Sequence, residues 1–319
     1  MQEILNKYQI RKTNKQKENF IEYLKNRLYK NGYTENDIKI EESGKWLAKT
    51  RNVVIGNPDN AKVIIGAHYD TPAVSPMPNF MCPINVLPFI LSQLFMLTVI
   101  FFTAWVITIP MAMIEMPAEL YVYSYEAIMF GFLFWLMFGY QNKHCANDNT
   151  SGTIALIKIL EELPKEKLKD VCIVFFDNEE KGLWGSTTFV NAHKSVKNNT
   201  LMLNLDCIGD GTHIATLAPK KTLQRDDYKK FVEICTKNAN ENELTYLNQK
   251  MKPMMFGSDQ AQFKHGVGIC ALNKHKLGFF YCDKIHTRKD KICKKENIDY
   301  LSNSIIEFIQ EGVCYDRTN

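Results

Sequence analysis

The feature that most constrains how this 319-residue chain can fold is a long segment without charge. Residues 71–114 include no Asp, Glu, Lys or Arg, and no Lys or Arg occurs anywhere in residues 63–142. An apolar run over residues 86–109 has the length of a membrane-spanning helix, since roughly 20 apolar residues cross the hydrocarbon of a bilayer. Pro110 marks its expected end, and a second apolar run follows at residues 121–140. These runs predict an inserted, transmembrane-like helical hairpin within residues 80–140.

The charges around the two runs predict how such a hairpin would lie. The connector carries Glu115 and Glu119 but no Lys or Arg, whereas the flanking chain holds all 39 Lys and Arg residues. By the positive-inside rule, the main domain stays in the cytosol of a cell-membrane protein. The second run is the weaker span because it contains Glu126. The alternative is a pair of apolar helices that pack as a lid on the domain or within a dimer.

Outside the hairpin, apolar runs of strand length alternate with amphipathic helical patterns. The predicted strands cover residues 50–56, 62–67, 171–176, 201–205 and 269–272. The predicted helices cover residues 15–31, 153–163, 185–194, 224–239 and 296–311. This alternation predicts an α/β fold, a three-layer α/β/α sandwich with a mixed, mainly parallel central sheet. Residues 1–79 and 141–319 are expected to form one domain that the hairpin interrupts.

Composition excludes several classes of protein. The net charge is only +4, which gives no electrostatic argument for nucleic acid binding. The nine cysteines are scattered without CxxC spacing, as expected of reduced thiols in a cytosolic domain. Residues 1–17 are basic and lack an apolar core, so we expect no signal peptide.

An acidic turn directly follows the buried-type strand at residues 171–176. Asp177, Glu179 and Glu180 place three carboxylates within four residues. Buried charge is costly unless something compensates it, and ligands of open α/β sheets bind at the carboxyl ends of strands. A divalent metal ion beside a carboxylate base would compensate the charge. The alternative is an acidic turn exposed to solvent.

Further potential metal ligands stand at comparable places in the chain. His68 and Asp206 each end a predicted strand, whereas Asp148 begins a helix and His286 lies in a loop. Imidazole and carboxylate ligands without thiolate suit Zn, Mn or Co at a hydrolytic site. We therefore expect these side chains to gather at one end of the sheet.

The motifs around these residues resemble those of the M28 metallopeptidases, which are zinc-dependent aminopeptidases. The matching motifs, in the family's order, are His68-Tyr69-Asp70, Asn147-Asp148-Asn149-Thr150-Ser151-Gly152, Asp177-Asn178-Glu179-Glu180 with Gly182-Leu183-Trp184-Gly185-Ser186, Asn204-Leu205-Asp206, and Ile285-His286-Thr287. They extend from about residue 50 to the C-terminus apart from the apolar insert.

The resemblance implies a co-catalytic site with two divalent metal ions, most simply Zn²⁺, with Mn²⁺ or Co²⁺ as alternatives. The implied ligands are the bridging carboxylate of Asp148, His68 and Asp206 for one metal, and Glu180 and His286 for the other. Glu179 matches the general base of the family. Asp70 would hold the second ring nitrogen of His68 and set its tautomer.

Two finer points follow from the same resemblance. The peptide bond between Asp148 and Asn149 is expected to be cis, as is common in the family. Gln260 stands where the family usually has histidine in a Ser-Asp-His segment, which puts a substrate-side role for that position in doubt. Asp259, just before it, is either a contact to the site or a helix cap.

The sequence therefore predicts a membrane-anchored metalloaminopeptidase that acts on peptides with a free N-terminus. A glutaminyl cyclase-like acyltransferase, which has the same fold but uses one zinc, is the alternative from another reaction class. A non-catalytic membrane protein that has kept the peptidase fold is the third possibility. Because both ends of the hairpin emerge beside the predicted site, we expect the site to face the membrane surface.

Overall fold

The computed structural model describes residues 1–312 with the exception of residues 76, 115 and 253. In this part of the chain nine strands form one mixed sheet in the order β1-β2-β4-β3-β5-β8-β6-β7, with β9 paired to β8. The strands are β1 (Ile38–Ser43), β2 (Thr50–Ile55), β3 (Val63–His68), β4 (Val171–Phe176), β5 (Leu201–Leu205), β6 (His213–Ala218), β7 (Thr245–Lys250), β8 (Gly266–Lys274) and β9 (Phe280–Tyr281).

The centre of the sheet is parallel. Strand β3 lies between β4 and β5 and runs parallel to both, and β5 runs parallel to β8. Antiparallel pairs flank this centre, at β1–β2 and β2–β4 on one side and at β6–β8 on the other. This confirms the predicted mixed, mainly parallel α/β sheet, and it brings the carboxyl ends of β3, β4 and β5 together at one edge.

Helices cover both faces of the sheet because alternate strand residues point to opposite sides. One face packs Ile65, Ile173 and Leu203 against α2, α5, α8 and α9. The other face packs Val174 and Met202 against α6 and α7. The helices of this α/β part are α1 (Gln2–Lys7), α2 (Asn14–Lys30), α5 (Gly152–Glu162), α6 (Trp184–Ala192), α7 (Lys194–Asn199), α8 (Asp226–Glu241) and α9 (Lys295–Gly312).

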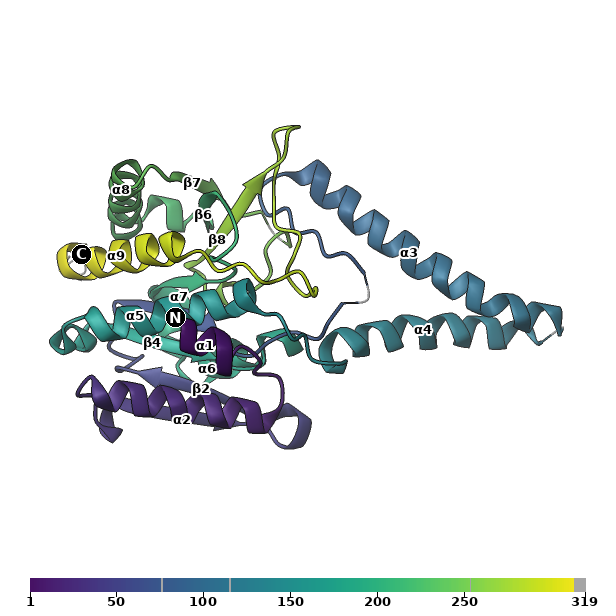
Figure 1. The fold of residues 1–319 in the computed structure, drawn as a ribbon, viewed down its shortest axis with the longest axis horizontal. Coiled ribbons are helices and arrows are strands. Elements are labelled where there is room, and N and C mark those ends of the chain that lie inside the picture. The colour runs from purple at the N-terminus through teal and green to yellow at the C-terminus, as the bar shows by residue number, and fades with distance from the viewer. Residues whose placement is uncertain (76, 115, 253, 313–319) are drawn as a thin grey trace.

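The predicted apolar runs are two long helices, α3 (Val86–Met113) and α4 (Ala118–Phe138). They project away from the α/β part and meet at the far end, as Figure 1 shows. Pro110 does not end α3 as predicted but lies inside it: its missing N–H removes one helical bond, to the carbonyl of Val106, and the helix continues to Met113. Glu115 of the predicted acidic connector lies outside the described residues.

Two other predictions differ from the structure. The helix expected at residues 185–194 is two helices, α6 and α7, which meet at His193, a residue with non-helical φ and ψ. The sequence pattern also fails to predict β6, the short β9 and the two ends of the sheet, β1 and β7. Both end strands carry exposed polar residues, as edge strands often do, and therefore lack a buried-strand pattern.

Candidate metal centre

The predicted ligands lie together at the carboxyl edge of the central strands. His68 is the last residue of β3, and its partner across β4 is Phe176, directly before the acidic turn. Asp206 directly follows β5, the other neighbour of β3. Asp148 lies in the irregular turn that leads into α5, and His286 comes from the loop before α9. Sheet register therefore positions three of these segments, and two loops complete the set.

Asp148 lies at the centre of this cluster, with its two carboxylate oxygens facing different partners. Oδ1 is 3.4 Å from His68 Nε2. Oδ2 is 3.0 Å from His286 Nε2. His68 Nε2 is also 3.6 Å from Asp206 Oδ1, and His286 Nε2 is 3.5 Å from Glu180 Oε2. One carboxylate thus joins two groups of ligand atoms, and the atoms within each group lie within 4.8 Å of one another.

The residues present fit divalent cations. Ligand atoms about 2.0–2.2 Å from a tetrahedral ion lie roughly 3.3–3.6 Å apart, which is close to the spacing found here. Glu180 Oε1 and Asp206 Oδ1 are buried without a hydrogen-bond partner among the described residues. Buried carboxylate oxygens are costly to leave unpaired, so a cation beside them would remove that cost. The donors are imidazole and carboxylate, the set preferred by Zn²⁺ and related ions.

Electrostatics at the site follow from this concentration of charge. Burial raises the pKa of Glu180 well above its usual value, and the neighbouring Asp148 adds to the effect. Burial acts to raise the pKa of Asp148 too, but hydrogen bonds from His286 and His68 outweigh it and hold that pKa well below its usual value. Burial acts to lower the pKa of His286, yet the Asp148 carboxylate raises it overall. The centre is therefore a set of strongly interacting acids and imidazoles.

Glu179, the predicted base, begins the short helical turn Glu179–Lys181. Its carboxylate is close to His68 and Glu180 as a third group of possible ligands, so proximity alone does not separate a base from a ligand. Burial raises the pKa of Glu179 well above its usual value, with Glu180 adding to the effect. A carboxyl with a raised pKa can hold and release a proton nearer to neutral pH.

Asp70 supports both sides of the site. Its Oδ1 accepts a hydrogen bond from the Glu179 N–H at 3.0 Å, and its Oδ2 accepts one from the Glu180 N–H at 3.3 Å. Oδ1 is 3.5 Å from His68 Nδ1, but the nearest partner of Nδ1 is the Asp70 backbone carbonyl at 3.1 Å. The Asp70 carbonyl, and not the predicted carboxylate, is therefore the nearer partner of His68 Nδ1. The sequence does not predict the contacts of Asp70 to the acidic turn.

Asp177 begins the turn without touching the ligand cluster. Its carboxylate forms a buried ion pair with Lys17 of α2 and accepts the Arg51 N–H at 2.9 Å. The Lys17 ammonium also donates to Asn178 Oδ1. The charge of Asp177 is therefore compensated by lysine rather than by metal. Sequence reasoning missed Lys17 because it lies 160 positions away on a helix that reads as simply amphipathic.

Comparison with known proteins agrees with this geometry. The model of peptidase family M28 matches residues 135–309, more than half of the chain. The chain belongs to peptidase family M28. The matched range contains Asp148, the acidic turn, Asp206 and His286, whereas His68 and most of the hairpin lie before it. No curated protein matches the chain.

Solved structures similar to this M28 chain fall into two groups by name. The LapA aminopeptidase of Legionella pneumophila is 14% identical, aligns over 97% of this chain and 68% of its own, and has a TM-score of 0.53. A Tannerella forsythia glutaminyl cyclase is 15% identical, aligns over 95% of this chain and 92% of its own, and has a TM-score of 0.54. The glutaminyl cyclase of Macrostomum lignano is 12% identical, with 96% and 86% coverage and a TM-score of 0.55. At sequence identities this low, the structural similarity establishes a shared fold and not a shared activity.

Two finer expectations from the M28 resemblance can be checked. The Asp148–Asn149 peptide bond is cis. Gln260, at the usual histidine position, is fully buried, where it accepts from Asn204 Nδ2 at 2.8 Å and donates to the Phe256 carbonyl at 2.9 Å. Gln260 thus ties β5 to the loop below the site. Burial raises the pKa of Asp259 to about 7, and neither of its oxygens has a hydrogen-bond partner among the described residues.

Two more residues of this M28 site were absent from the sequence prediction. The Asp290 carboxylate accepts the backbone N–H groups of Asn147 and Asp148, at 2.8 and 3.0 Å, and so orients the Asp148 backbone. The buried Arg11 guanidinium donates to the Tyr69 carbonyl and to Thr150 Oγ1, which joins the N-terminal segment to both ligand loops. Asp290 and Arg11 each lie in a charged stretch whose sequence pattern is typical of a loop exposed to solvent.

Proposed function

We propose that this chain is a two-metal aminopeptidase that removes N-terminal residues from peptides. The observation that carries the proposal is the position of Asp148, whose two oxygens face two separate groups of possible ligands. A one-metal site does not need a bridging carboxylate, whereas a co-catalytic pair does. His68 and Asp206 would complete one metal, and Glu180 and His286 the other.

The residues around the cluster support a hydrolytic role. When bound, two divalent cations would acidify a water molecule and polarise the scissile carbonyl. The Glu179 carboxylate would then take a proton from that water and deliver it to the leaving nitrogen. Asp70 accepts the backbone N–H of Glu179, so it would keep this carboxylate oriented toward the cluster.

The space beside the cluster suits the end of a peptide rather than its middle. A cavity of about 370 Å³ is lined by the ligand residues and by Met81, Leu183 and Phe256. This volume is near the lower limit for a small-molecule site, roughly 300–1,000 Å³. An N-terminal residue with its apolar side chain fits such a space, and LapA, whose fold is similar, is named as an aminopeptidase.

The proposal is tested by offering the full chain unblocked and N-acetylated aminoacyl substrates with added Zn²⁺, Mn²⁺ or Co²⁺. We expect turnover of the unblocked substrates only. Glu179→Gln should lower kcat by about 10²–10⁴-fold while leaving metal content unchanged, because it removes the proton acceptor. Equal turnover of the acetylated substrates would rule out an aminopeptidase, and full activity of the Gln variant would rule out Glu179 as the base.

A glutaminyl cyclase is the second candidate, and one observation favours it. The two cyclase structures align over 92% and 86% of their own length, compared with 68% for LapA. A peptide that begins with glutamine distinguishes the two activities. A cyclase releases ammonia and leaves the peptide length unchanged, whereas an aminopeptidase releases free glutamine. A catalytically inactive protein with the same fold would do neither, although it would still bind peptide or metal.

We further propose that α3 and α4 insert into the cell membrane and leave the α/β part in the cytosol. Val86–Met111 and Ala118–Phe138 are long and apolar enough to cross a bilayer, by length and composition only. At 1.5 Å per residue they span about 39 and 32 Å. Large apolar side chains are exposed along both helices, among them Leu91, Trp105 and Phe130. In water such a surface would be an aggregation liability.

Replacing residues 80–140 with a short Gly/Ser loop tests the membrane proposal. The full chain should sediment with phospholipid vesicles, and the loop variant should remain in the supernatant. If both partition alike, the hairpin does not anchor the chain, and helices that pack as a lid or within a dimer become the better account.

A further inference from the structure

A second cavity, of about 840 Å³, lies where α3 leaves the α/β part. Its walls are the first three turns of α3, the segment before it at residues 78–80, and the loop at residues 277–279. We propose that this cavity holds apolar residues of the peptide substrate that lie beyond the scissile bond. The inference rests on the proposed aminopeptidase function and adds a preference for peptides with an apolar segment.

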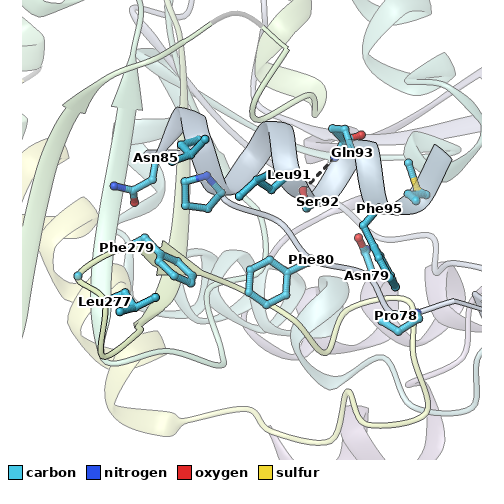
Figure 2. A pocket seen from close by; sticks show the side chains of 14 residues that line it. Pro78, Asn79, Phe80, Asn85, Leu91, Ser92, Gln93, Phe95, Leu277 and Phe279 are labelled. Carbon is cyan, nitrogen blue, oxygen red and sulfur yellow. Dashed lines mark hydrogen bonds between the residues drawn. The ribbon is translucent and has the colours of Figure 1, made fainter. Parts of the chain in front are cut away.

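The lining selects for an uncharged, apolar occupant. Figure 2 shows Phe80 and Phe279 below the first turns of α3, which add Leu91 and, beside Asn79, Phe95 to the lining. The two phenyl rings are 6.3 Å apart. None of the described residues that line the cavity is Asp, Glu, Lys, Arg or His. A charged segment would lose its hydration there without gaining an ionic partner, so charged peptides are disfavoured.

This cavity shares a wall with the catalytic one. Phe80 lines the apolar cavity and the next residue, Met81, lines the metal site. Met81 exchanges two backbone hydrogen bonds with Cys282, at 2.8 and 2.9 Å, and the Phe80 ring stacks on Tyr281 at 5.1 Å. The chain from Cys282 continues to His286 in the metal site. On this inference, a peptide bound at the metal site would extend over this two-chain wall into the apolar cavity.

The polar side chains of the cavity favour a peptide over a lipid chain. Asn79, Asn85 and Gln93 place three amide groups among the apolar residues. One of them, Asn85, already accepts the Phe280 N–H through Oδ1 at 2.8 Å, which leaves its amide NH₂ as a donor. Gln93 donates to Ser92 Oγ at 3.4 Å, whereas the amides of Asn79 and Asn85 can hydrogen-bond a peptide backbone. An acyl chain has no group to pair with these two amides.

The test uses two amidated pentapeptides that share their first two residues. Their N-terminal residue is one that the enzyme accepts in the assay with short aminoacyl substrates. One continues with Leu-Leu-Phe and the other with Ser-Ser-Asn. We expect the KM of the apolar peptide to be about tenfold lower for the full chain in phosphatidylcholine vesicles, because its side chains leave water. The short aminoacyl substrate, which does not reach the cavity, is the reference.

Variants then locate the source of the preference. Leu91→Trp fills the cavity from α3, and Leu277→Asp places a charge at its rim, since Leu277 is 82% exposed in a loop outside the hairpin. Both should bring the two KM values to within about twofold without changing kcat on the short substrate. Leu94→Trp is the matched control, since Leu94 is 53% exposed on the same helix, compared with 56% for Leu91, and does not line the cavity. It should keep the preference.

The outcomes separate this inference from the proposed function. Turnover of all peptides with equal KM, or a preference that survives both variants, would overturn the inference alone. Absence of turnover of any free-amine substrate would overturn the proposed function and the inference with it. If added lysophospholipid changes the KM of the short substrate and the effect disappears in Leu91→Trp, the cavity holds a lipid chain and the peptide assignment is wrong.

Discussion

The sheet edge and the hairpin distribute their residues in opposite ways. At the sheet edge, His68, Asp148 and Asp206 are buried at 1%, 3% and 6% exposure, although each carries or can carry charge. Along the hairpin, Leu and Phe side chains are exposed, as at Phe130. In water, both arrangements are costly unless something outside the chain compensates them. The buried ionisable side chains of the sheet edge favour a bound cation. The exposed apolar side chains of the hairpin favour contact with an apolar surface outside the chain.

The two regions also differ in how much of the chain supports them. The metal centre is held by hydrogen bonds from distant segments, such as Lys17 to the acidic turn and Asp290 to the Asp148 backbone. The helices α3 and α4 contact one another toward the far end and touch the α/β part at their bases. A change at the centre should therefore propagate, whereas a change along the hairpin should remain local.

The largest expected effect comes from the residue that faces both ligand groups. Asp148→Asn removes the bridging charge while keeping the side-chain volume. We expect metal content to fall from two ions per chain to less than one, and kcat/KM to fall about ten-thousandfold, which is roughly 5.5 kcal/mol of transition-state stabilisation. Elemental analysis and the aminoacyl assay check this. A variant that keeps two metals and full activity would show that Asp148 does not bridge.

Next in size is the ion pair below the acidic turn. Lys17→Met leaves the Asp177 carboxylate buried with its charge uncompensated, and we expect a loss of about 3–5 kcal/mol in the free energy of unfolding. Urea unfolding measures it. Lys15→Met, at an exposed position of the same helix, is the control and should change stability by no more than about 0.5 kcal/mol.

A double variant separates the charge from the packing. Asp177→Asn combined with Lys17→Met removes both charges and keeps an acceptor for the Arg51 N–H. Because the cost comes from an unpaired buried charge, the double variant should recover much of the lost stability. If it is as unstable as Lys17→Met alone, the loss came from the lysine stem and its packing, and the electrostatic account is wrong.

The sequence predicts the parts of this molecule that local patterns encode. Buried runs at residues 62–67, 171–176 and 201–205 predict three strands, and each run is followed by a residue or turn of the metal-ligand type. The contacts of Lys17 and Arg11 could not be predicted because each joins segments far apart in the chain and gives no local periodicity. Pro110 predicts a helix end from the sequence alone, yet α3 continues past it to Met113, because a proline does not always end a helix.

An intermediate effect is expected at Asp70, which touches the centre only through other residues. Asp70→Asn weakens the carboxylate contacts to the Glu179 and Glu180 N–H groups and to His68. Loss of such a supporting partner typically lowers metal affinity 10–100-fold, and we expect a change in that range. Competition with a chelator measures it. Asp59→Asn, the same exchange on the opposite side of the fold from the ligands, should leave the affinity unchanged.

The smallest effect is expected on the hairpin, and its size is informative. Phe130 on α4 is 69% exposed, so Phe130→Ala should change the free energy of unfolding by no more than about 0.5 kcal/mol in one fixed detergent. Phe175→Ala in β4, where the side chain is fully buried, should cost about 3–5 kcal/mol and shows that the assay responds.

The same pair of variants distinguishes the two media that could cover α4. In lipid, Phe130 meets apolar surroundings whether or not the α/β part is folded, so its truncation changes little. In a dimer, Phe130 would be buried only in the assembled state. Its truncation would then destabilise the chain by more than about 1 kcal/mol, and the loss would vary with protein concentration because association stabilises the folded state by mass action. A concentration-dependent loss would therefore replace the membrane account of the hairpin with a subunit interface.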